Sequence, residues 1–466
     1  MPTATNIQII SPVDGKIYAT RPAATDAAVD AALDRAQAAQ TLWRATPLAD
    51  RIKLLAKAAA HMNTVKAAIG EELAWQMGRP IRYGANEIAR GFTERAEYMA
   101  AVAPEVLADI DVGRKDGFKR FIRRDPVGTV FVIAPWNYPF LTAVNSIWPA
   151  LIAGNTVILK HASQTLLVGE RFQEALDKAG LPKGVFQNLA LTHEQAARII
   201  LSGRVNHIAF TGSVEGGRTI ERLAAGHFIG VGLELGGKDP AYVRADANID
   251  YAVENLVDGA FFNSGQSCCG VERIYVDKSL LPKFVDAFSA MTAGYVLDTP
   301  LEEATTLGPM VNAKAADFVR GQIDSAVRAG AKKHIDTAKF RRDAKGSPYM
   351  APQVLTNVNH QMAVMREESF GPVIGIMAVA DDEEAVKLMN DSPFGLTASV
   401  WTSDAAAAER LGDRIETGTV YMNRCDYLDP ALAWTGVKET GRGVTLSRLG
   451  YDAVTQAKSF HLKLQT

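Results

Sequence analysis

The chain has 466 residues, which is too many for one hydrophobic core and enough for two or three domains. Hydrophobic residues make up 47% and charged residues 22%, as in ordinary globular proteins, and a formal net charge of −2 gives no general attraction for nucleic acid or an anionic membrane. Three cysteines are too few for a disulfide framework, and the N-terminal residues lack the pattern of a secretory signal. We therefore expect a reducing compartment, the cytoplasm.

The first hundred residues are predicted to be mostly helical. Apolar residues recur there at helical intervals in three segments, 24–39, 54–62 and 69–77. Thr25, near the start of the first segment, is a candidate N-cap because its hydroxyl can accept a hydrogen bond from a free backbone N–H.

The segment 127–159 contains no Lys, Arg, Asp or Glu and is long enough to span a bilayer. However, Pro135, Pro139 and Pro149 interrupt it, and Gly154-Asn155 is a turn signal. Its β-branched stretches are typical of buried strands in a parallel sheet, which are continuously apolar. We expect no contact with a membrane.

Strands and helices alternate over the rest of the chain. Before residue 237, strands are expected at 130–134, 156–160, 185–189, 206–210 and 228–233, and helices at 145–153, 166–178, 193–202 and 216–224. From 237 to 440, strands are expected at 273–276 and 397–401, and helices at 252–262, 282–292 and 313–329. This alternation predicts an α/β protein with two doubly wound parallel-sheet domains.

Two segments outside these series alternate polar and apolar residues. In 109–126, the turn signal Lys115-Asp116-Gly117 predicts a β-hairpin. Residues 458–464 alternate in the same way. We expect 109–126 and 441–466 to form a small β arm for oligomerisation, because strands outside the domains can pair with another subunit.

The densest chemical signal is the segment 261–270, with the sequence FFNSGQSCCG. Cys268 lies there in a turn of small and amide residues, where a substrate could reach a nucleophile; a buried structural thiol is the alternative. Glu234 ends an apolar strand and precedes two glycines. A carboxylate is costly to bury without purpose, so Glu234 is a candidate catalytic group, with a solvent-facing strand end as the alternative.

Two more signals lie at the carboxyl ends of predicted strands, where α/β sheets bind ligands. Asn137 is an amide donor in a loop that prolines on both sides make rigid. Thr211, Gly212 and Ser213 form a turn that enters a helix, and backbone N–H groups at a helix start can hold a phosphate. The full dinucleotide fingerprint is missing, so this turn is a weak signal by itself.

Further motifs accompany these, in a fixed order along the chain. They are PWNYP at 135–139, the strand that ends at Lys160, FTGS at 210–213, LELGGK at 233–238, FFNSGQSCC at 261–269, EESFGP at 367–372 and SPFGL at 392–396. Together they resemble the aldehyde dehydrogenase superfamily, from near Asn6 to the C-terminus. An ordered set over a whole chain is more specific than any single motif.

The resemblance implies NAD(P)-dependent oxidation of an aldehyde to a carboxylic acid. Hydride cannot leave a flat aldehyde carbon until a nucleophile has made it tetrahedral, and by resemblance Cys268 is that nucleophile, with Cys269 as a bystander. Asn137 and the backbone N–H of Cys268 would bind the oxyanion, and Glu234 would be the general base that activates water. The apolar neighbours of Glu234 predict a raised pKa.

The same resemblance implies an NAD(P)-binding domain from 1–108 and 127–236, a catalytic domain from 237–440, and a homodimer or homotetramer. Ser213 would bind the pyrophosphate, Lys160 the adenosine ribose and Glu368 the nicotinamide ribose; a solvated Lys160 and a surface-paired Glu368 are the alternatives. The other residues expected near the cofactor are Trp136, Ser163, Thr211, Gly212, Gly236 and Phe370.

The chain departs from the family pattern beside the cofactor. Many NAD-preferring members carry a glutamate three residues after the Lys160 position, where it accepts a hydrogen bond from the ribose 2′-OH. Here the residue is Ser163, which lacks a charge that would repel a 2′-phosphate, and Lys160 could pair with that phosphate. We expect that NADP is accepted, and NAD use stays open.

The substrate pocket is harder to infer. Succinate semialdehyde members commonly have an arginine shortly after the PWN loop, where this chain has Asn145. Trp434 stands where phenylalanine is usual. The pocket is expected to comprise Tyr138, Phe262, Arg424, Leu428 and Trp434. An apolar or aromatic aldehyde follows from the aromatic side chains, and Arg424 leaves a semialdehyde open.

The residues favour this function over its alternatives. Acylating relatives transfer the acyl group to coenzyme A and typically lack the general-base glutamate, so Glu234 favours a free acid as product. A catalytically silent binding or structural protein is the alternative from another class, although every catalytic position carries a competent residue. A cysteine hydrolase would need a histidine that pairs with the cysteine, and none of the histidines lies in a recognisable dyad motif. No metal site is expected, because the histidines lack the spacing of metal ligands.

Overall fold

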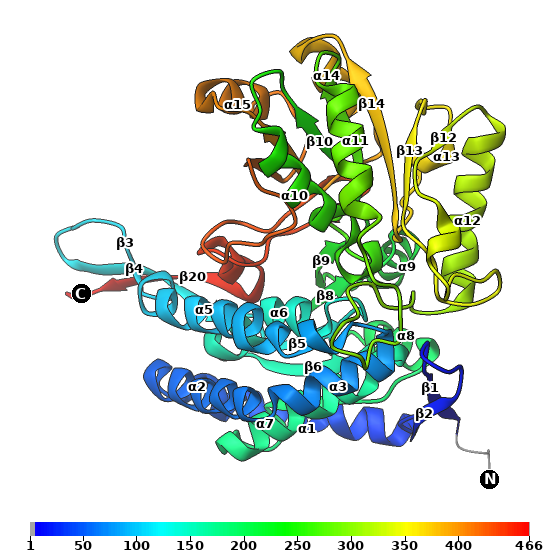
Figure 1. Ribbon diagram of the computed structural model, residues 1–466. Helices are drawn as coiled ribbons and strands as arrows, with labels where there is room; N and C mark the ends of the chain where they lie inside the picture. Colours follow the sequence, from blue (N-terminus) through cyan, green and yellow to red (C-terminus); the bar gives the residue numbers. More distant parts are fainter. Residues whose placement is uncertain (1–4, 466) are drawn as a thin grey trace.

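A computed structural model describes residues 5–465, which form two mainly parallel β-sheets covered by helices (Figure 1). A hairpin of β1 (Asn6–Ile10) and β2 (Ile17–Pro22) comes first. The helices that follow are α1 (Asp26–Ala45), α2 (Leu48–Thr64), α3 (Lys66–Met77), α4 (Ile81–Gly84), the π-helix η1 (Glu87–Phe92) and α5 (Thr93–Val106). The Thr25 side chain accepts a hydrogen bond from the Ala28 N–H at 3.2 Å, which confirms the predicted N-cap.

The first sheet has six strands in the order β19-β9-β8-β5-β6-β7. Its strands are β5 (Thr129–Ile133), β6 (Thr156–Lys160), β7 (Phe186–Asn188), β8 (His207–Thr211), β9 (Gly230–Glu234) and the antiparallel β19 (Gly441–Arg442), and its connecting helices are α6 (Pro139–Ala153), α7 (Leu166–Ala179), α8 (His193–Leu201) and α9 (Val214–Ala224). The chain runs outward from β5 to β7 and returns on the other side of β5 at β8. This strand order confirms the predicted doubly wound sheet. In such sheets, ligands bind in the crevice at the point where the strand order reverses.

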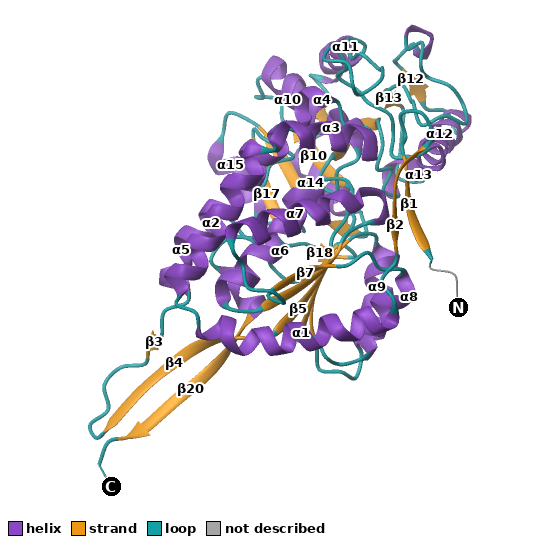
Figure 2. Cartoon of the chain, turned by 90° about the horizontal axis from the view of Figure 1, so that it is seen from below, coloured by secondary structure: helices purple, strands orange, loops and turns teal. Residues whose placement is uncertain are grey.

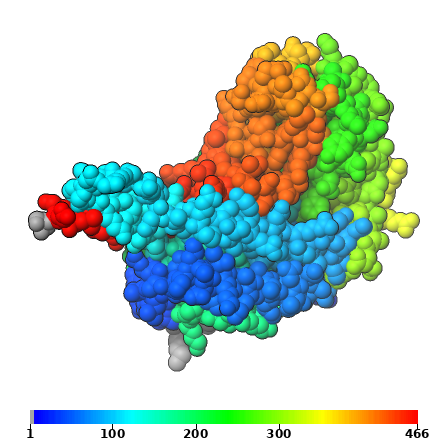
Figure 3. Space-filling model, turned by 90° about the vertical axis from the view of Figure 1, so that its left-hand side faces the viewer, coloured from blue at the N-terminus to red at the C-terminus, as the bar shows by residue number. Residues whose placement is uncertain are grey.

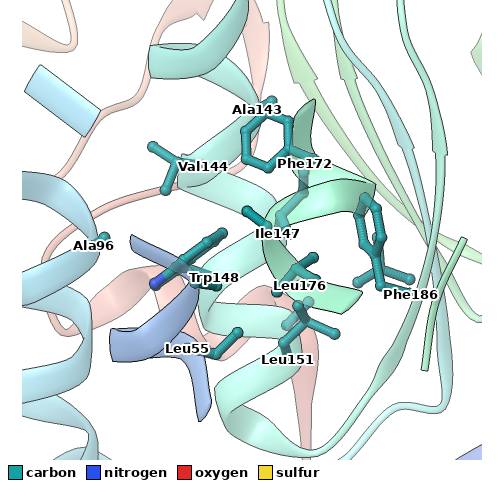
Figure 4. Close-up of a cluster of buried hydrophobic side chains, with 14 of the residues drawn as sticks. Leu55, Ala96, Ala143, Val144, Ile147, Trp148, Leu151, Phe172, Leu176 and Phe186 are labelled. Atoms are coloured by element: carbon teal, nitrogen blue, oxygen red, sulfur yellow. The ribbon is translucent and has the colours of Figure 1, made fainter. Parts of the chain in front are cut away.

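Helix α6 begins at Pro139, earlier than the predicted start at residue 145, because proline is well tolerated in the first helical turn. Almost every side chain of α6 is buried. Figure 4 shows Ile147 and Leu151 of α6 close to Leu55 of α2 and Leu176 of α7. A helix covered all round is hydrophobic all round, which explains the uncharged stretch of sequence. Within residues 5–465, every helix is too short or too polar to cross a membrane.

The second sheet has seven strands in the order β12-β13-β14-β11-β10-β16-β17. These are β10 (Asp239–Val243), β11 (Val271–Asp277), β12 (Lys332–Lys333), β13 (Gln353–Thr356), β14 (Val373–Val379), β16 (Thr397–Trp401) and β17 (Thr419–Met422); only β12 is antiparallel to its neighbour. The helices around it are α10 (Ile249–Phe261), α11 (Leu281–Thr292), α12 (Ala313–Arg328), α13 (Ala363–Arg366), α14 (Asp382–Asn390) and α15 (Ala405–Gly412). Two short strands, β15 (Phe394–Gly395) and β18 (Val437–Lys438), pair antiparallel as a separate two-stranded sheet.

A three-stranded sheet extends from the body as an arm (Figures 2 and 3). Its central strand β4 (Phe118–Pro126) pairs antiparallel along its whole length with β20 (Thr455–Lys463). The hairpin predicted at 109–126 is present, because β3 (Ile110–Asp111) pairs antiparallel with β4. It pairs over only two residues, and β20 gives β4 a far longer register. Residues 441–454 lie outside the arm: β19 joins the first sheet, and the 3-10 helix η5 (Leu449–Val454) packs against α6.

Candidate active site

Cys268 lies in a tightly held loop between α10 and β11. Asn263 and Ser264 have positive φ angles of 54° and 58°, so the chain turns sharply after the helix. The Ser264 hydroxyl donates to the Gly308 carbonyl at 2.8 Å, and the Gln266 side-chain oxygen accepts from the Val311 N–H at 2.7 Å. These bonds explain the small and amide residues before Cys268, because each satisfies a buried backbone group.

The predicted oxyanion residue, Asn137, lies against this loop. The Asn137 side-chain nitrogen donates to the backbone carbonyl of Gln266 at 3.2 Å. The backbone carbonyl of Asn137 accepts a hydrogen bond from the Asn263 side chain at 3.2 Å. The structure therefore brings the PWNYP loop and the cysteine loop together, although they are far apart in sequence. One N–H of the Asn137 amide remains for another acceptor.

A buried ion pair that the sequence did not reveal supports both loops. Arg79, on the stretch between α3 and α4, pairs with Glu87 of η1 and also donates to the Asn137 carbonyl. The other Glu87 oxygen accepts from the Phe140 N–H at 2.8 Å, at the start of α6. Both charged side chains are almost fully buried. No local pattern marks these residues, because their partners are distant in the chain.

Glu234 ends β9, and both of its carboxylate oxygens are held. Thr211 donates to Oε2 at 3.0 Å and Thr445 donates to Oε1 at 2.5 Å. Burial raises the pKa of the Glu234 carboxyl above its usual value, as predicted, while the two hydroxyls and the charge of Arg95 oppose that rise. A carboxyl with a raised pKa is a more effective proton acceptor near neutral pH.

The paired glycines after Glu234 bring the two sheets close together. A Cβ on Gly237 would collide with the Cys268 carbonyl oxygen, and a Cβ on Gly236 would stand 2.6 Å from the Glu368 carboxylate. Only glycine therefore fits where this strand end meets the cysteine loop. The buried Lys238, in the same motif, pairs with Glu272, whose oxygens accept from the backbone N–H groups that follow Glu368.

Cys269 also lines the cavity of Cys268, but it is buried and its thiol is held by hydrogen bonds. Its thiol donates to Asp426 at 3.0 Å, and the Ser267 hydroxyl donates to the same oxygen at 3.0 Å. A hydrogen bond with Cys268, followed by burial, raises the pKa of the Cys269 thiol well above its usual value. Burial also raises the pKa of Asp426 to about 7. This arrangement keeps Cys269 protonated.

Cys268 and Glu234 line one cavity of about 260 Å³. Four of the five predicted pocket residues line it as well: Tyr138, Phe262, Leu428 and Trp434. Arg424 was expected there and does not line it; its exposed guanidinium stacks 3.4 Å from the ring centre of Tyr427. Cation–π stacking on this ring explains the side chain's direction. The cavity instead contains Arg95 of α5, which the sequence did not single out.

The predicted cofactor residues lie at the carboxyl edge of the first sheet. Trp136 follows β5, Lys160 ends β6, and Ser163 opens a 3-10 turn (Ser163–Thr165) just beyond it. Thr211 ends β8, Gly212 follows it, and Ser213 caps α9 by accepting from the Gly216 N–H at 3.2 Å.

Two further cofactor candidates come from the second sheet. Glu368 accepts from the Gly237 N–H at 2.9 Å, and burial raises its pKa to about 7. Phe370 meets Trp136 edge to face, with ring centres 5.7 Å apart.

These residues fit a dinucleotide. Lys160 is 5% exposed, and within residues 5–465 no carboxylate lies within salt-bridge distance of its ammonium group. Burial lowers the pKa of Lys160, so an anionic or hydroxyl ligand is needed to stabilise its charge. The start of α9 and the strand reversal between β5 and β8 lie at the same edge, where a phosphate would be bound by backbone N–H groups.

Comparisons with known proteins identify the family of the chain. The family model described as "Aldehyde dehydrogenase family" matches residues 1–460. Succinate-semialdehyde dehydrogenase (NADP(+)) of Mycobacterium avium (strain 104) is 34% identical, over 98% of this chain and 96% of that protein. Betaine aldehyde dehydrogenase of Rhizobium leguminosarum bv. trifolii (strain WSM2304) is 31% identical, over 98% of this chain and 94% of that protein.

A solved structure is similar over the whole chain. The NADP-dependent glyceraldehyde-3-phosphate dehydrogenase of Bacillus halodurans C-125, complexed with NADP, is 31% identical with a TM-score of 0.93, over 100% of this chain and 97% of that one. The chain belongs to the aldehyde dehydrogenase family of NAD(P)-dependent oxidoreductases, which confirms the resemblance and the α/β fold. The substrates in these names differ widely, so kinship alone selects none of them.

Proposed function

We propose that the chain oxidises an aldehyde to the carboxylic acid with NADP⁺ or NAD⁺, through a thiohemiacetal and a thioester on Cys268. The observation that carries this proposal is that Cys268 and Glu234, from opposite sides of the junction between the sheets, line the same cavity. A nucleophile and a base that face one space can act in succession on the same carbon atom.

In the first step the Cys268 thiolate forms a C–S bond with the aldehyde carbon, and the electron pair of the C=O π bond moves to the oxygen, which takes the negative charge. The free N–H of the Asn137 amide and the backbone N–H of Cys268 are the donors proposed for that oxygen. When bound, nicotinamide supplies the acceptor for the hydride that leaves the tetrahedral carbon. A thioester remains on Cys268.

In the second step Glu234 takes a proton from water, and the water oxygen attacks the thioester carbon. The C–S bond then breaks, the carboxylic acid leaves, and Cys268 is regenerated as a thiolate. The hydrogen bonds from Thr211 and Thr445 hold the Glu234 carboxylate in one orientation for this proton transfer. The raised pKa of Glu234 supports its role as the base.

For the cofactor, we propose that NADP is accepted, with Lys160 near the 2′-phosphate. The lysine's buried charge without a carboxylate partner supports this proposal, as does the uncharged Ser163 after it. The names of the relatives from Mycobacterium avium and Bacillus halodurans include NADP. NAD use stays open, because Lys160 can also donate to a ribose hydroxyl.

For the substrate, the cavity walls support an apolar or aromatic carbon body. The side chains of Tyr138, Phe262, Leu428 and Trp434 form those walls, and a carbon chain or ring is stabilised by burial against them.

We further propose that the arm joins two or four copies of the chain, because β4 and β20 extend beyond the body and an edge strand can pair with another copy.

The test is the appearance of reduced cofactor with a panel of aliphatic, aromatic and ω-carboxylated aldehydes, run with NADP, with NAD, and with or without coenzyme A. We expect turnover without coenzyme A, none by Cys268→Ala, and a trapped acyl-enzyme in Glu234→Gln. Turnover only with coenzyme A would indicate acyl transfer. Cofactor binding without any turnover would favour a silent protein.

A further inference from the structure

Arg95 is a buried cation in the cavity of Cys268 that the proposed chemistry does not use. It belongs to α5 and is 6% exposed. Its Nη1 atom donates to the Leu141 carbonyl at 2.6 Å and to the Asn145 side-chain oxygen at 3.2 Å. Both of these acceptors lie on α6. The guanidinium is therefore anchored on one side and fixed in orientation.

Among residues 5–465, no acid neutralises the Arg95 guanidinium directly. Within residues 5–465, no carboxylate lies within salt-bridge distance of Arg95, and the opposite charges that act on it do so from further away. Arginine keeps its charge in proteins, and a buried charge without a counter-ion is unfavourable. An anion that enters the cavity would remove this cost.

The acids nearby have other partners. Glu234 is held by its two threonine hydroxyls, and Glu94 accepts from the Tyr427 hydroxyl at 2.8 Å. Asp426 holds Ser267 and Cys269. Asp258 also lines the cavity, but it is not among the charges that act on Arg95. None of them supplies Arg95 with a bidentate partner.

Asn145 adds a second donor beside Arg95. It is 1% exposed and lines the same cavity. Its oxygen is used by Arg95, and its buried Nδ2 atom has no hydrogen-bond partner in the protein. A buried amide N–H without an acceptor is unfavourable in the same way as the unpaired charge. A single carboxylate could accept from both side chains.

We propose that Arg95 and Asn145 bind a carboxylate at the far end of the substrate, so that the preferred aldehydes carry an acidic group as well as the reacting carbonyl. This proposal rests on the proposed attack of Cys268 on the aldehyde. The planar guanidinium suits a carboxylate, and it repels an ammonium group. The aromatic walls would hold the carbon body between the two ends of the substrate.

A matched pair of substrates tests the proposal: 4-carboxybenzaldehyde and 4-isopropylbenzaldehyde, whose ring substituents have three heavy atoms each and differ in charge and polarity. The wild type should prefer the acid, and in Arg95→Met the ratio of kcat/KM values, acid to neutral, should fall at least about 30-fold, mainly through KM. Arg95→Lys should recover part of the ratio. Arg424→Met, the same change at an exposed arginine outside the cavity, should leave the ratio within about two-fold of the wild type.

Asn145→Asp is a second variant that keeps Arg95 anchored. It places a carboxylate of the protein against the guanidinium, and we expect the same fall in the acid-to-neutral ratio. A ratio unchanged in both Arg95→Met and Asn145→Asp, or a wild type that prefers betaine aldehyde over the acid, would overturn the proposal. Thermal melting of each variant checks that it is folded.

Calorimetry with succinate separates this proposal from the proposed function, because it needs no turnover. Succinate should bind full-length Cys268→Ala, and the added Arg95→Met change should weaken binding at least about 30-fold. Aldehyde oxidation without succinate binding would overturn the carboxylate site and leave the proposed function standing. Succinate binding that depends on Arg95, without oxidation of any aldehyde, would overturn the proposed function and leave the carboxylate site standing.

Discussion

The carboxylate of Glu234 accepts a hydrogen bond at 2.5 Å from Thr445, a residue 211 positions further along the chain. Thr445 comes directly after the segment that adds β19 to the edge of the first sheet. The C-terminal part of the chain thus sets the orientation and the proton affinity of the proposed base, because a hydrogen bond to a carboxylate stabilises its charged form.

Replacing Thr445 by valine should slow the hydrolysis step. The hydroxyl lowers the pKa of Glu234, so its loss raises that pKa further and leaves less of the basic form at neutral pH. The rising limb of the kcat profile should move to higher pH, and kcat at neutral pH should fall about 10-fold. Thr46→Val, at an exposed helix end, is the control. An unshifted profile would contradict the role of Thr445.

The two adjacent cysteines should respond differently to substitution. Cys268→Ala should lose at least about 10³-fold in kcat, whereas Cys269→Ala should keep activity within about 10-fold. A hydrogen bond with Cys268, burial and the charge of Asp426 raise the pKa of the Cys269 thiol and keep it protonated, so it is a poor nucleophile. Alkylation by iodoacetamide followed by peptide mass spectrometry should find the label on Cys268. Label mainly on Cys269 would reverse the assignment.

A carboxylate at position 163 should weaken NADP binding relative to NAD binding. In Ser163→Glu, the new charge would lie just beyond Lys160 and repel the 2′-phosphate. We expect the ratio of the NADP Kd to the NAD Kd to rise about 10- to 100-fold, as measured by calorimetry. Ser163→Gln, with the same shape and no charge, is the control. Equal changes in both variants would show that bulk, not charge, is responsible.

Breaking the buried pair of Arg79 and Glu87 should destabilise the protein. Glu87→Gln removes one charge and leaves the Arg79 guanidinium buried without a counter-ion. The apparent free energy of unfolding should fall by about 3–5 kcal/mol, measured by urea denaturation. The exposed pair Arg414 and Glu383 provides the control: Glu383→Gln should cost less than about 1 kcal/mol.

Removal of the C-terminal strand should change the oligomeric state. Deletion of residues 455–466 takes away β20, the main partner of β4, and leaves β4 with an unpaired edge. Light scattering after gel filtration should show a smaller assembly or aggregation. An oligomer of unchanged size and activity would mean that the arm is not the joining element.

Local signals in the sequence predicted most of the fold and the proposed catalytic residues. The strands of the first sheet follow from continuous apolar runs, because burial on both faces excludes charge from them. Short motifs located Cys268, Glu234 and Asn137, since each lies in a turn whose glycines, prolines or amides have a local structural reason. Tyr138 and Phe262 were found for the same reason, as they adjoin those motifs, whereas Trp434 followed from the family resemblance.

The tertiary structure alone decided the contacts between segments that are distant in the chain. Arg95, Thr445 and the pair of Arg79 and Glu87 lie in ordinary helical or loop sequence, and only the folded chain aims them at the cavity and its supporting loops. Arg424 shows the converse, because a neighbouring aromatic ring turned it away from the cavity. Side-chain direction depends on the partners that packing supplies, and no local pattern encodes those partners.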